Sequence, residues 1–250
     1  MAVHALWSDM TDTVRKRSPT WLGRIWAETE PRVLAGLALA VGGIWAILLL
    51  GGEVREGETG AFDRRILLDL RVPGQPHLPI GPPWLQDVMR DVTALGSSTM
   101  VILVTSLAVA ALAFHRHRRR AIVLALVMVS AQGCDELLKG LYGRARPDFA
   151  LIGVYSYAQS FPSGHSSASA ALWLSLATIA ASFEPTWGRK AFWFVVAVII
   201  VLGVGLSRIY LGVHWPTDVL AGWMLGAGWA LGGWLAWRAL DVRGGARPAG

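Results

Sequence analysis

Residues 33–52 read VLAGLALAVGGIWAILLLGG, a run of twenty positions without a charged side chain. A helix needs about 20 mostly apolar residues to cross the hydrocarbon core of a bilayer. Only helices and closed barrels satisfy their backbone hydrogen bonds in lipid, so this run predicts a transmembrane helix. The segment before it is too long and too polar for the first part of a signal peptide, and we interpret the run as an uncleaved first span.

Five further apolar runs follow along the chain. They occupy residues 92–114, 121–134, 162–183, 191–206 and 218–237. Counted from 33–52 as the first, the third and fifth runs are followed directly by polar residues, and the fourth and sixth begin with polar residues. The sequence therefore predicts an all-α fold, a single bundle of six transmembrane helices within residues 33–240.

The composition is that of a membrane protein. Hydrophobic residues make up 54% of the chain and charged residues only 16%, whereas soluble domains carry about 25% charged residues. The single cysteine, Cys134, excludes an intrachain disulfide and a cysteine-rich metal site. The net charge is +6, but the basic residues flank the apolar runs, so lipid headgroups and membrane topology explain them better than a nucleic-acid partner.

The distribution of lysine and arginine predicts the orientation in the membrane. The loop at 115–120 reads HRHRRR, and the segments on its side of the membrane hold most of the 23 Lys and Arg residues. Cytoplasmic loops are enriched in these residues. We therefore predict a cytoplasmic N-terminal segment (1–32), a cytoplasmic tail (241–250) and a location in the inner membrane of a bacterial-type cell. The loops after spans one, three and five then face the periplasm.

The longest outward connection, 53–91, contains a short amphipathic pattern. Phe62, Ile66, Leu67 and Leu70 recur at helical spacing among charged residues. This pattern is typical of a helix that lies in the membrane surface. We expect a short interfacial helix between spans one and two.

Polar residues gather at the outward ends of the spans in three groups. The first, KGLYGRARP at 139–147, places Lys139, Arg144 and Arg146 where span three leaves the membrane. Asp135 lies one helical turn before Lys139 and is positioned to hold its ammonium group. Ionisable residues near membrane depth are costly and usually functional, so these cations predict a site for an anion.

The second group, PSGH at 162–165, opens span four. A helix N-terminus offers unpaired backbone N–H groups and a positive dipole, and therefore attracts phosphate. Ser163 adds a hydroxyl donor, and Gly164 lets the backbone approach a ligand closely.

The third group places Ser207 and Arg208 ahead of His214 and Asp218. His214 and Asp218 are four residues apart, so the carboxylate can reach one imidazole nitrogen. The other nitrogen is then available to attack or to transfer a proton.

A metal site is the alternative use of the histidines and carboxylates. However, the same region holds four cationic side chains, Lys139, Arg144, Arg146 and Arg208. An environment this positive repels a divalent metal and attracts an anion. We predict phosphate chemistry without a metal or another cofactor.

Together the three groups resemble the signature motifs of the type 2 phosphatidic acid phosphatase superfamily, in the same order. The matching positions are Lys139-x6-Arg146-Pro147, Pro162-Ser163-Gly164-His165 and Ser207-Arg208-x5-His214-x3-Asp218. Phe62-Asp63 and DVTALG at 91–96 extend the resemblance over most of the chain. The six spans distinguish the chain from the soluble haloperoxidase branch, which shares the motifs and binds vanadate.

The resemblance implies a role for each matched residue. His214 attacks phosphorus and becomes phosphohistidine, Asp218 orients His214, and His165 protonates the leaving oxygen. The phosphate oxygens are bound by Lys139, Arg146, Arg208, the Ser163 hydroxyl and the Gly164 amide.

The motifs leave alternative roles for two neighbouring charged residues, Arg144 and Asp148. Arg144 contacts either a second phosphate or the headgroup region. Asp148 stands where many relatives carry a basic residue; it pairs with Arg144, alters headgroup preference, or lies on the surface.

The implied activity is hydrolysis of a lipid phosphate or diphosphate. Undecaprenyl diphosphate, phosphatidylglycerol phosphate and phosphatidic acid are the substrate types considered. The same residues would serve a lipid phosphotransferase, which passes the phosphoryl group to another lipid instead of water. A transporter or channel is the third hypothesis, but its path should carry polar residues at mid-span or on both sides, whereas here they cluster at one membrane face.

Overall fold

The computed structural model describes residues 31–149 and 159–245. It divides the chain into two compact units, Met1–Ala38 and Leu39–Gly250, and the second unit contains the helical bundle. The predicted cytoplasmic segment 1–32 lies almost entirely outside the described residues. The predicted tail begins as helix, and its last residues, 246–250, are also outside them.

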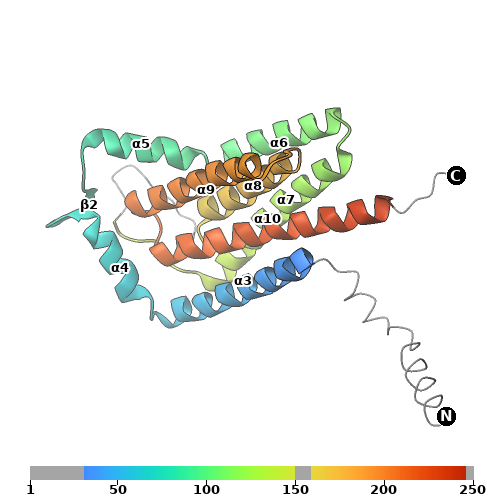
Figure 1. The fold of residues 1–250 in the computed structure, drawn as a ribbon. Coiled ribbons are helices and arrows are strands. Elements are labelled where there is room, and N and C mark those ends of the chain that lie inside the picture. The colour runs from blue at the N-terminus through green and yellow to red at the C-terminus, as the bar shows by residue number, and fades with distance from the viewer. Residues whose placement is uncertain (1–30, 150–158, 246–250) are drawn as a thin grey trace, which may run out of the picture. The chain divides into compact units, whose positions relative to one another are not determined.

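The described chain is mostly helical. The helices are α3 (Pro31–Glu56), α4 (Gly60–Asp69), α5 (Pro83–Ala94), α6 (Ser98–Phe114), α7 (Arg118–Tyr142), α8 (Gly164–Ala181), α9 (Trp187–Tyr210) and α10 (Pro216–Gly245). Helices α6 to α10 lie side by side, with α8 packed against α6, α7, α9 and α10 (Figure 1).

A helix occurs at each of the six predicted spans, but the count of six membrane crossings is not confirmed. Four helices, α3, α7, α9 and α10, are long and apolar enough to cross a membrane. A fifth crossing results if α5 and α6, bent by 44° at their junction, form one broken span. Helix α8 is not among them, because it carries serines such as Ser166 and Ser169 that are buried inside the bundle.

The predicted second span is interrupted at residues 95–97. Helix α5 ends at Ala94, and Ser97 begins α6 by accepting a hydrogen bond from Met100 N at 3.3 Å. A Cβ atom at Gly96 would lie 2.8 Å from the backbone oxygen of His165. Only a residue without a side chain fits there, so this junction packs directly against the start of α8.

The outward connection differs from the prediction in two ways. A two-stranded antiparallel hairpin, β1 (Arg71–Val72) and β2 (Gln75–Pro79), corrects the all-α prediction. Its turn contains Gly74 with φ 79°, a conformation that favours glycine. The predicted interfacial helix is present as α4, but Asp63 and Leu67 are fully buried, and α4 packs against α10.

Small residues allow α8 and α10 to approach closely. A Cβ atom at Gly222 would lie 2.6 Å from Ser163 O, and one at Gly226 would clash with Ser167 O. Glycines four residues apart are a common means of bringing membrane helices into contact. This contact fixes the start of α8 against the first turns of α10.

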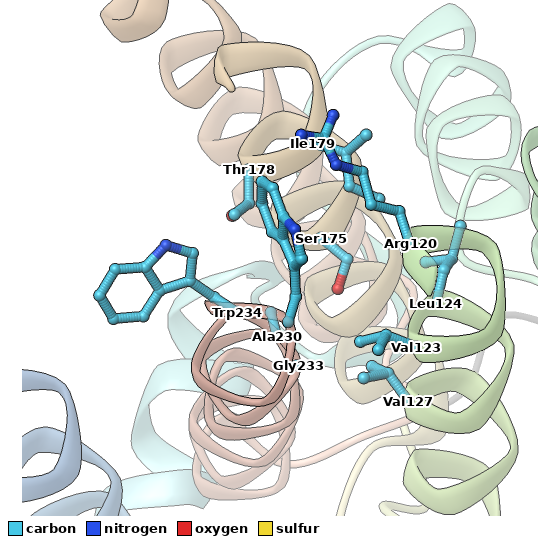
Figure 2. A pocket seen from close by; sticks show the side chains of 11 residues that line it. Arg120, Val123, Leu124, Val127, Ser175, Thr178, Ile179, Ala230, Gly233 and Trp234 are labelled. Atoms are coloured by element: carbon cyan, nitrogen blue, oxygen red, sulfur yellow. The ribbon is translucent and has the colours of Figure 1, made fainter. Parts of the chain in front are cut away.

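Near the other ends of the same helices, α7, α8 and α10 line a small pocket (Figure 2). Arg120, in the first turn of α7, lies with its guanidinium carbon 4.5 Å from the Phe183 ring centre and 4.3 Å from that of Trp237. Cation–π contacts of this kind stabilise by about 0.5–2 kcal/mol. They connect α7 to α10 and to the residues just after α8.

Candidate active site

The loop after α7, the start of α8 and the loop between α9 and α10 meet at one end of the bundle. Gly143 ends α7 in the left-handed conformation (φ 58°), and the chain continues toward Arg146. Arg146 Nη1 donates to Val213 O at 2.7 Å, and Ser163 N donates to Asp218 O at 3.0 Å. These two hydrogen bonds join all three sequence groups.

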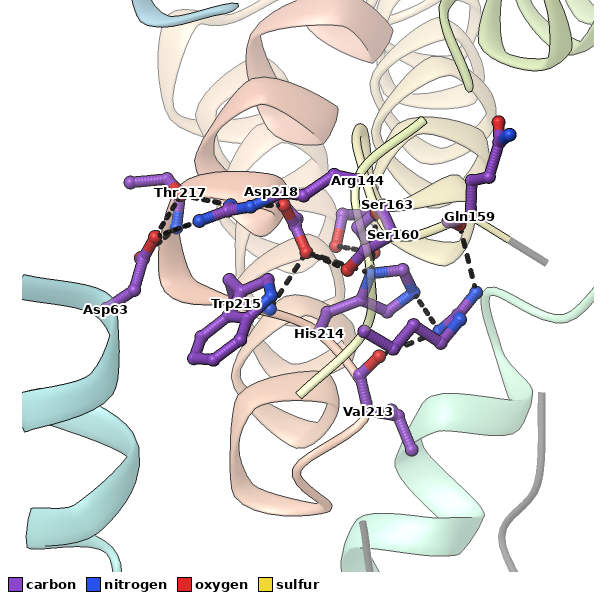
Figure 3. Close-up of polar contacts among 12 residues, drawn as sticks. Asp63, Arg144, Gln159, Ser160, Ser163, Val213, His214, Trp215, Thr217 and Asp218 are labelled. Carbon is purple, nitrogen blue, oxygen red and sulfur yellow. Dashed lines mark hydrogen bonds and ion pairs between the residues drawn. The ribbon is translucent and has the colours of Figure 1, made fainter. Parts of the chain in front are cut away.

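His214 is almost completely buried, with 1% of its surface exposed. Its Nδ1 lies 2.9 Å from Ser160 O and 3.5 Å from Asp218 Oδ2 (Figure 3). Its Nε2 lies 3.0 Å from Arg146 Nη1, which is always a donor. The hydrogen therefore belongs on Nδ1, and the Nε2 lone pair points toward the guanidinium.

The surroundings of His214 favour a neutral imidazole. Burial, together with the positive charges of Arg208 and Arg146, lowers the pKa of His214 to about 4. The hydrogen bond with Asp218 acts in the opposite direction and is weaker than the effect of burial. A neutral ring keeps the Nε2 lone pair that a nucleophile needs.

We expect His214 to stay neutral as the pH falls from the ordinary histidine pKa of 6.5 until it approaches about 4. The unfolded chain takes up this proton near 6.5, so the folded state should lose stability across the same interval as the pH falls. Nitrogen-15 NMR of histidine-labelled protein in detergent would follow the ring, with His214→Asn assigning its signal. Protonation of this ring at the ordinary histidine value would contradict the prediction.

The Asp218 carboxylate is fully buried and accepts hydrogen bonds on both oxygens. Oδ2 accepts from Trp215 N at 2.9 Å and from the Ser160 hydroxyl. Oδ1 accepts from Arg144 Nη1 at 2.7 Å. Because a buried charge is costly unless it is paired and hydrogen-bonded, these contacts keep Asp218 ionised beside His214.

Lys139 and Asp135 of α7 lie against the start of α8. Lys139 Nζ donates to Asp135 Oδ2 at 2.5 Å, so the pairing expected from their spacing is present. A Cβ atom at Gly164 would lie 3.0 Å from both Lys139 Nζ and Asp135 Oδ2. The missing side chain thus allows the ammonium group to approach the helix N-terminus. Ser163 is fully buried and accepts a hydrogen bond from Ser166 Oγ at 3.0 Å.

Arg208 and His165 complete the set of predicted residues. Arg208 is 7% exposed and donates from Nη1 to Thr93 Oγ1 at 3.2 Å. Its Nε has no hydrogen-bond partner among residues 31–149 and 159–245. The charges of Arg208, Arg146 and Lys139 all act on the His165 ring, which therefore lies in the same cluster as His214.

The contacts of Arg144 differ from both predicted ones, a second phosphate and the headgroup region. Its two terminal nitrogens donate to buried carboxylates, Nη1 to Asp218 and Nη2 to Asp63 Oδ2 at 2.7 Å. Asp148 is exposed, and the carboxylates that pair with Arg144 are these two. Arg144 thus contacts the carboxylate that lies 3.5 Å from His214 Nδ1.

Several residues of the cluster were missed by sequence reasoning. Ser160 and Asp63 contact Asp218 and Arg144 from segments that the motif spacing does not connect, and Thr217, which contacts Arg144, lies at an unspecified position within the third motif. Thr93 touches Arg208 from the end of α5. Asp63 and Thr93 do lie in the stretches that extend the family resemblance, which was the available signal.

Within the described parts of the chain, no group of three or more His, Cys, Asp and Glu residues is arranged to hold a metal ion. Cationic side chains are the prominent feature instead, with Arg146 beside His214 and Lys139 beside Gly164. Guanidinium and ammonium groups of this kind bind phosphate oxygens.

Comparison with known proteins agrees with this chemistry. The model of the PAP2 superfamily matches residues 120–241. Phosphatidylglycerophosphatase B of Bacillus subtilis is 36% identical over 148 residues, covering 59% of this chain and 72% of that protein. Undecaprenyl-diphosphatase of Sulfolobus acidocaldarius is 32% identical over 149 residues, covering 57% of this chain and 66% of that protein.

A solved structure has the same fold. It is the crystal structure of a transmembrane PAP2-type phosphatidylglycerolphosphate phosphatase from Bacillus subtilis, with a TM-score of 0.71 and 29% identity. The match covers 82% of this chain and 96% of the solved one. Several apolar helices and this transmembrane relative identify a multi-pass membrane protein. The chain belongs to the PAP2 superfamily, the type 2 phosphatidic acid phosphatases, and it is a phosphatase.

Proposed function

We propose that the protein hydrolyses a lipid phosphate or diphosphate through a phosphohistidine formed on His214. The observation that carries this proposal is the state of the His214 ring. Its Nδ1 faces Ser160 O and Asp218, and its Nε2 lone pair faces the Arg146 guanidinium. An incoming phosphate group can take over the Arg146 hydrogen bond and place phosphorus in line with Nε2.

The first step forms a P–N bond and breaks a P–O bond. Nε2 of His214 attacks phosphorus, and the leaving lipid oxygen takes a proton from His165, whose protonated form is favoured by the negative charge of the bound phosphate. The ring becomes positively charged while Nδ1 keeps its hydrogen, and Asp218 and Ser160 O stabilise that charge. In-line transfer depends mainly on positioning and on charge stabilisation around the phosphoryl oxygens.

The second step returns the enzyme to its starting state. His165, now neutral, takes a proton from water, the water oxygen attacks phosphorus, and the P–N bond breaks. The products are inorganic phosphate and a lipid alcohol, or a lipid monophosphate if the substrate was a diphosphate. His165 ends with the proton that it donated in the first step, so the cycle is balanced.

The protein's own cations bind the phosphate in this mechanism. Arg146, Arg208 and Lys139 contact the phosphoryl oxygens, with the Ser163 hydroxyl and the Gly164 amide as further donors. Arginine forks match the geometry of phosphate oxygens. Loss of one such donor is expected to cost roughly 3–4 kcal/mol of barrier, by comparison with oxyanion-hole donors. We therefore propose that turnover needs no metal.

The substrate is a lipid because the site lies at the end of a bundle of apolar helices. Two relatives are named for phosphatidylglycerophosphate and undecaprenyl diphosphate, which supports a membrane lipid phosphate as the substrate class. The loop at 115–120, rich in arginine, joins α6 to α7 at the end of the bundle opposite the site (Figure 1). We propose six crossings of the inner membrane, and the positive-inside rule then favours cytoplasmic termini and a periplasmic active site.

A panel of lipid phosphates presented to the purified protein tests this proposal. We expect release of inorganic phosphate from at least one of phosphatidylglycerol phosphate, undecaprenyl diphosphate and phosphatidic acid, undiminished by EDTA. In sealed right-side-out vesicles, substrate added outside should be hydrolysed without permeabilisation. A requirement for magnesium would contradict the metal-free mechanism, and phosphate appearing on an acceptor lipid would indicate a phosphotransferase.

A further inference from the structure

A network of buried charges connects α4 to the carboxylate beside His214 (Figure 3). Arg144 Nη1 lies 2.7 Å from Asp218 Oδ1, and Arg144 Nη2 lies 2.7 Å from Asp63 Oδ2. The Asp63 and Asp218 side chains are fully buried, and that of Arg144 is 14% exposed. We refer to these three side chains as the Asp63–Arg144–Asp218 network.

Asp63 also holds the first turn of α10. Its Oδ1 accepts from Thr217 N at 3.0 Å, and its Oδ2 accepts from Thr217 Oγ1 at 2.7 Å. A carboxylate at a helix N-terminus satisfies a backbone N–H group that has no partner within the helix. Asp63 therefore fixes the residue next to Asp218 as well as the arginine that contacts it.

The position of the Arg144 guanidinium is determined from several sides. Nη1 donates to Thr217 Oγ1 at 2.8 Å, and Nη2 donates to Thr59 Oγ1 at 3.2 Å. The guanidinium carbon lies 5.3 Å from the ring centre of Trp215. Both terminal nitrogens of Arg144 thus donate to buried carboxylates, whereas those of Arg146 face backbone carbonyls and the His214 ring, and this difference distinguishes Arg144 from a phosphate ligand.

The network also decides which oxygen of Asp218 faces His214. Oδ1 is bound to Arg144, so Oδ2 is the oxygen that lies 3.5 Å from His214 Nδ1. Without the guanidinium, the carboxylate could rotate and two buried negative charges would lack their shared cation. Breaking a buried ion pair by removing one partner is strongly destabilising for the group that remains.

We infer that Asp63 and Arg144 are positioning residues, which hold Asp218 in the orientation that aligns His214 for attack on phosphorus. This inference rests on the proposed function, because it assigns α4 a part in the same reaction. Neither side chain touches the substrate. The effect of changing them should therefore appear in the chemical step and not in phosphate binding.

Arg144→Lys is the sharpest variant, because lysine keeps the charge but cannot fork between two carboxylates. We expect kcat for a lipid phosphate to fall roughly 10- to 100-fold, as misplacement of a reacting group by about 1 Å does. KM and the inhibition constant of inorganic phosphate should stay within about threefold of the wild type. Asp63→Asn keeps the side-chain volume. It should likewise lower kcat and leave KM close to the wild-type value.

Matched controls are available on the same helix. Arg65 and Asp69 of α4 are exposed, so Arg65→Lys and Asp69→Asn should leave kcat unchanged. Thermal unfolding of each variant in detergent distinguishes misfolding from misalignment. Arg144→Gln is the second variant. Because Arg144 and Asp63 belong to one network, the double variant Arg144→Gln/Asp63→Asn should lose less kcat than the product of the two single-variant losses.

The outcomes separate this inference from the proposed function. Wild-type turnover with an unchanged kcat in folded Arg144→Lys and Asp63→Asn would overturn the positioning role. A weakened inhibition by inorganic phosphate in Arg144→Lys would overturn it as well, in favour of direct phosphate contact. Failure of the wild type to release phosphate from any lipid substrate would instead reject the proposed function.

Discussion

Replacing His214 by asparagine should abolish turnover, with kcat for a lipid phosphate falling by about 10⁴-fold or more. Loss of a catalytic nucleophile in a well-studied hydrolase costs about 2 × 10⁶ in kcat, which sets the scale. Asparagine keeps a polar group in this buried site but has no ring nitrogen to form a P–N bond. Turnover should be measured by phosphate release from purified protein.

The same variant tests the intermediate. Wild-type protein mixed with substrate labelled on the transferred phosphate, then quenched in base, should retain label on the chain, because phosphohistidine survives base and is lost in acid. His214→Asn should retain none. His77→Asn, which changes an exposed histidine of β2, is the matched control and should behave as wild type. Substantial turnover or retained label in His214→Asn would reject His214 as the nucleophile.

His165→Asn should give the second large effect, a loss of roughly 10²- to 10⁴-fold in kcat for a lipid phosphate, the usual contribution of general acid–base catalysis. The leaving alkoxide of a lipid needs a proton, whereas nitrophenolate leaves without one. With p-nitrophenyl phosphate we therefore expect a burst of one equivalent of nitrophenolate. Turnover should then stall, because His165 also assists the attacking water.

The burst separates the two roles of His165. Accumulation of labelled phosphohistidine in this variant would indicate that the second step is blocked while the first proceeds. Absence of the nitrophenolate burst, so that the first step is slowed for the aryl substrate as much as for the lipid, would contradict the assignment of His165 as the acid. The His77→Asn protein again serves as the control, since its change in composition is the same.

The helices and most of the site were predictable because their signals are local. A run such as 33–52 predicts a membrane helix from composition alone, and α3 is found there. Asp135 and Lys139 are one helical turn apart, so their contact follows from spacing, as observed at 2.5 Å. His214 and Asp218 are likewise four residues apart and lie together.

Other features depend on packing between distant segments. The uncharged run from 92 to 114 was predicted as one span from its apolar length, but it breaks where Gly96 packs against His165. Ser160 reaches Asp218 across 58 positions, and Asp63 reaches Thr217 across 154. The buried face of α4 was assigned to the membrane surface because its amphipathic pattern does not identify what covers it.

The sequence by itself determined that the chain is a helical membrane protein, and it predicted that His214, His165, Asp218 and a set of cations form one phosphate site. Apolar length and short motif spacings are sufficient for both conclusions. Only the tertiary structure decided that Arg144 contacts Asp218 and Asp63, 74 and 81 positions away. A guanidinium can bind a phosphate or a carboxylate equally well, so its role depends on which partner the packing of α4 against α10 places beside it.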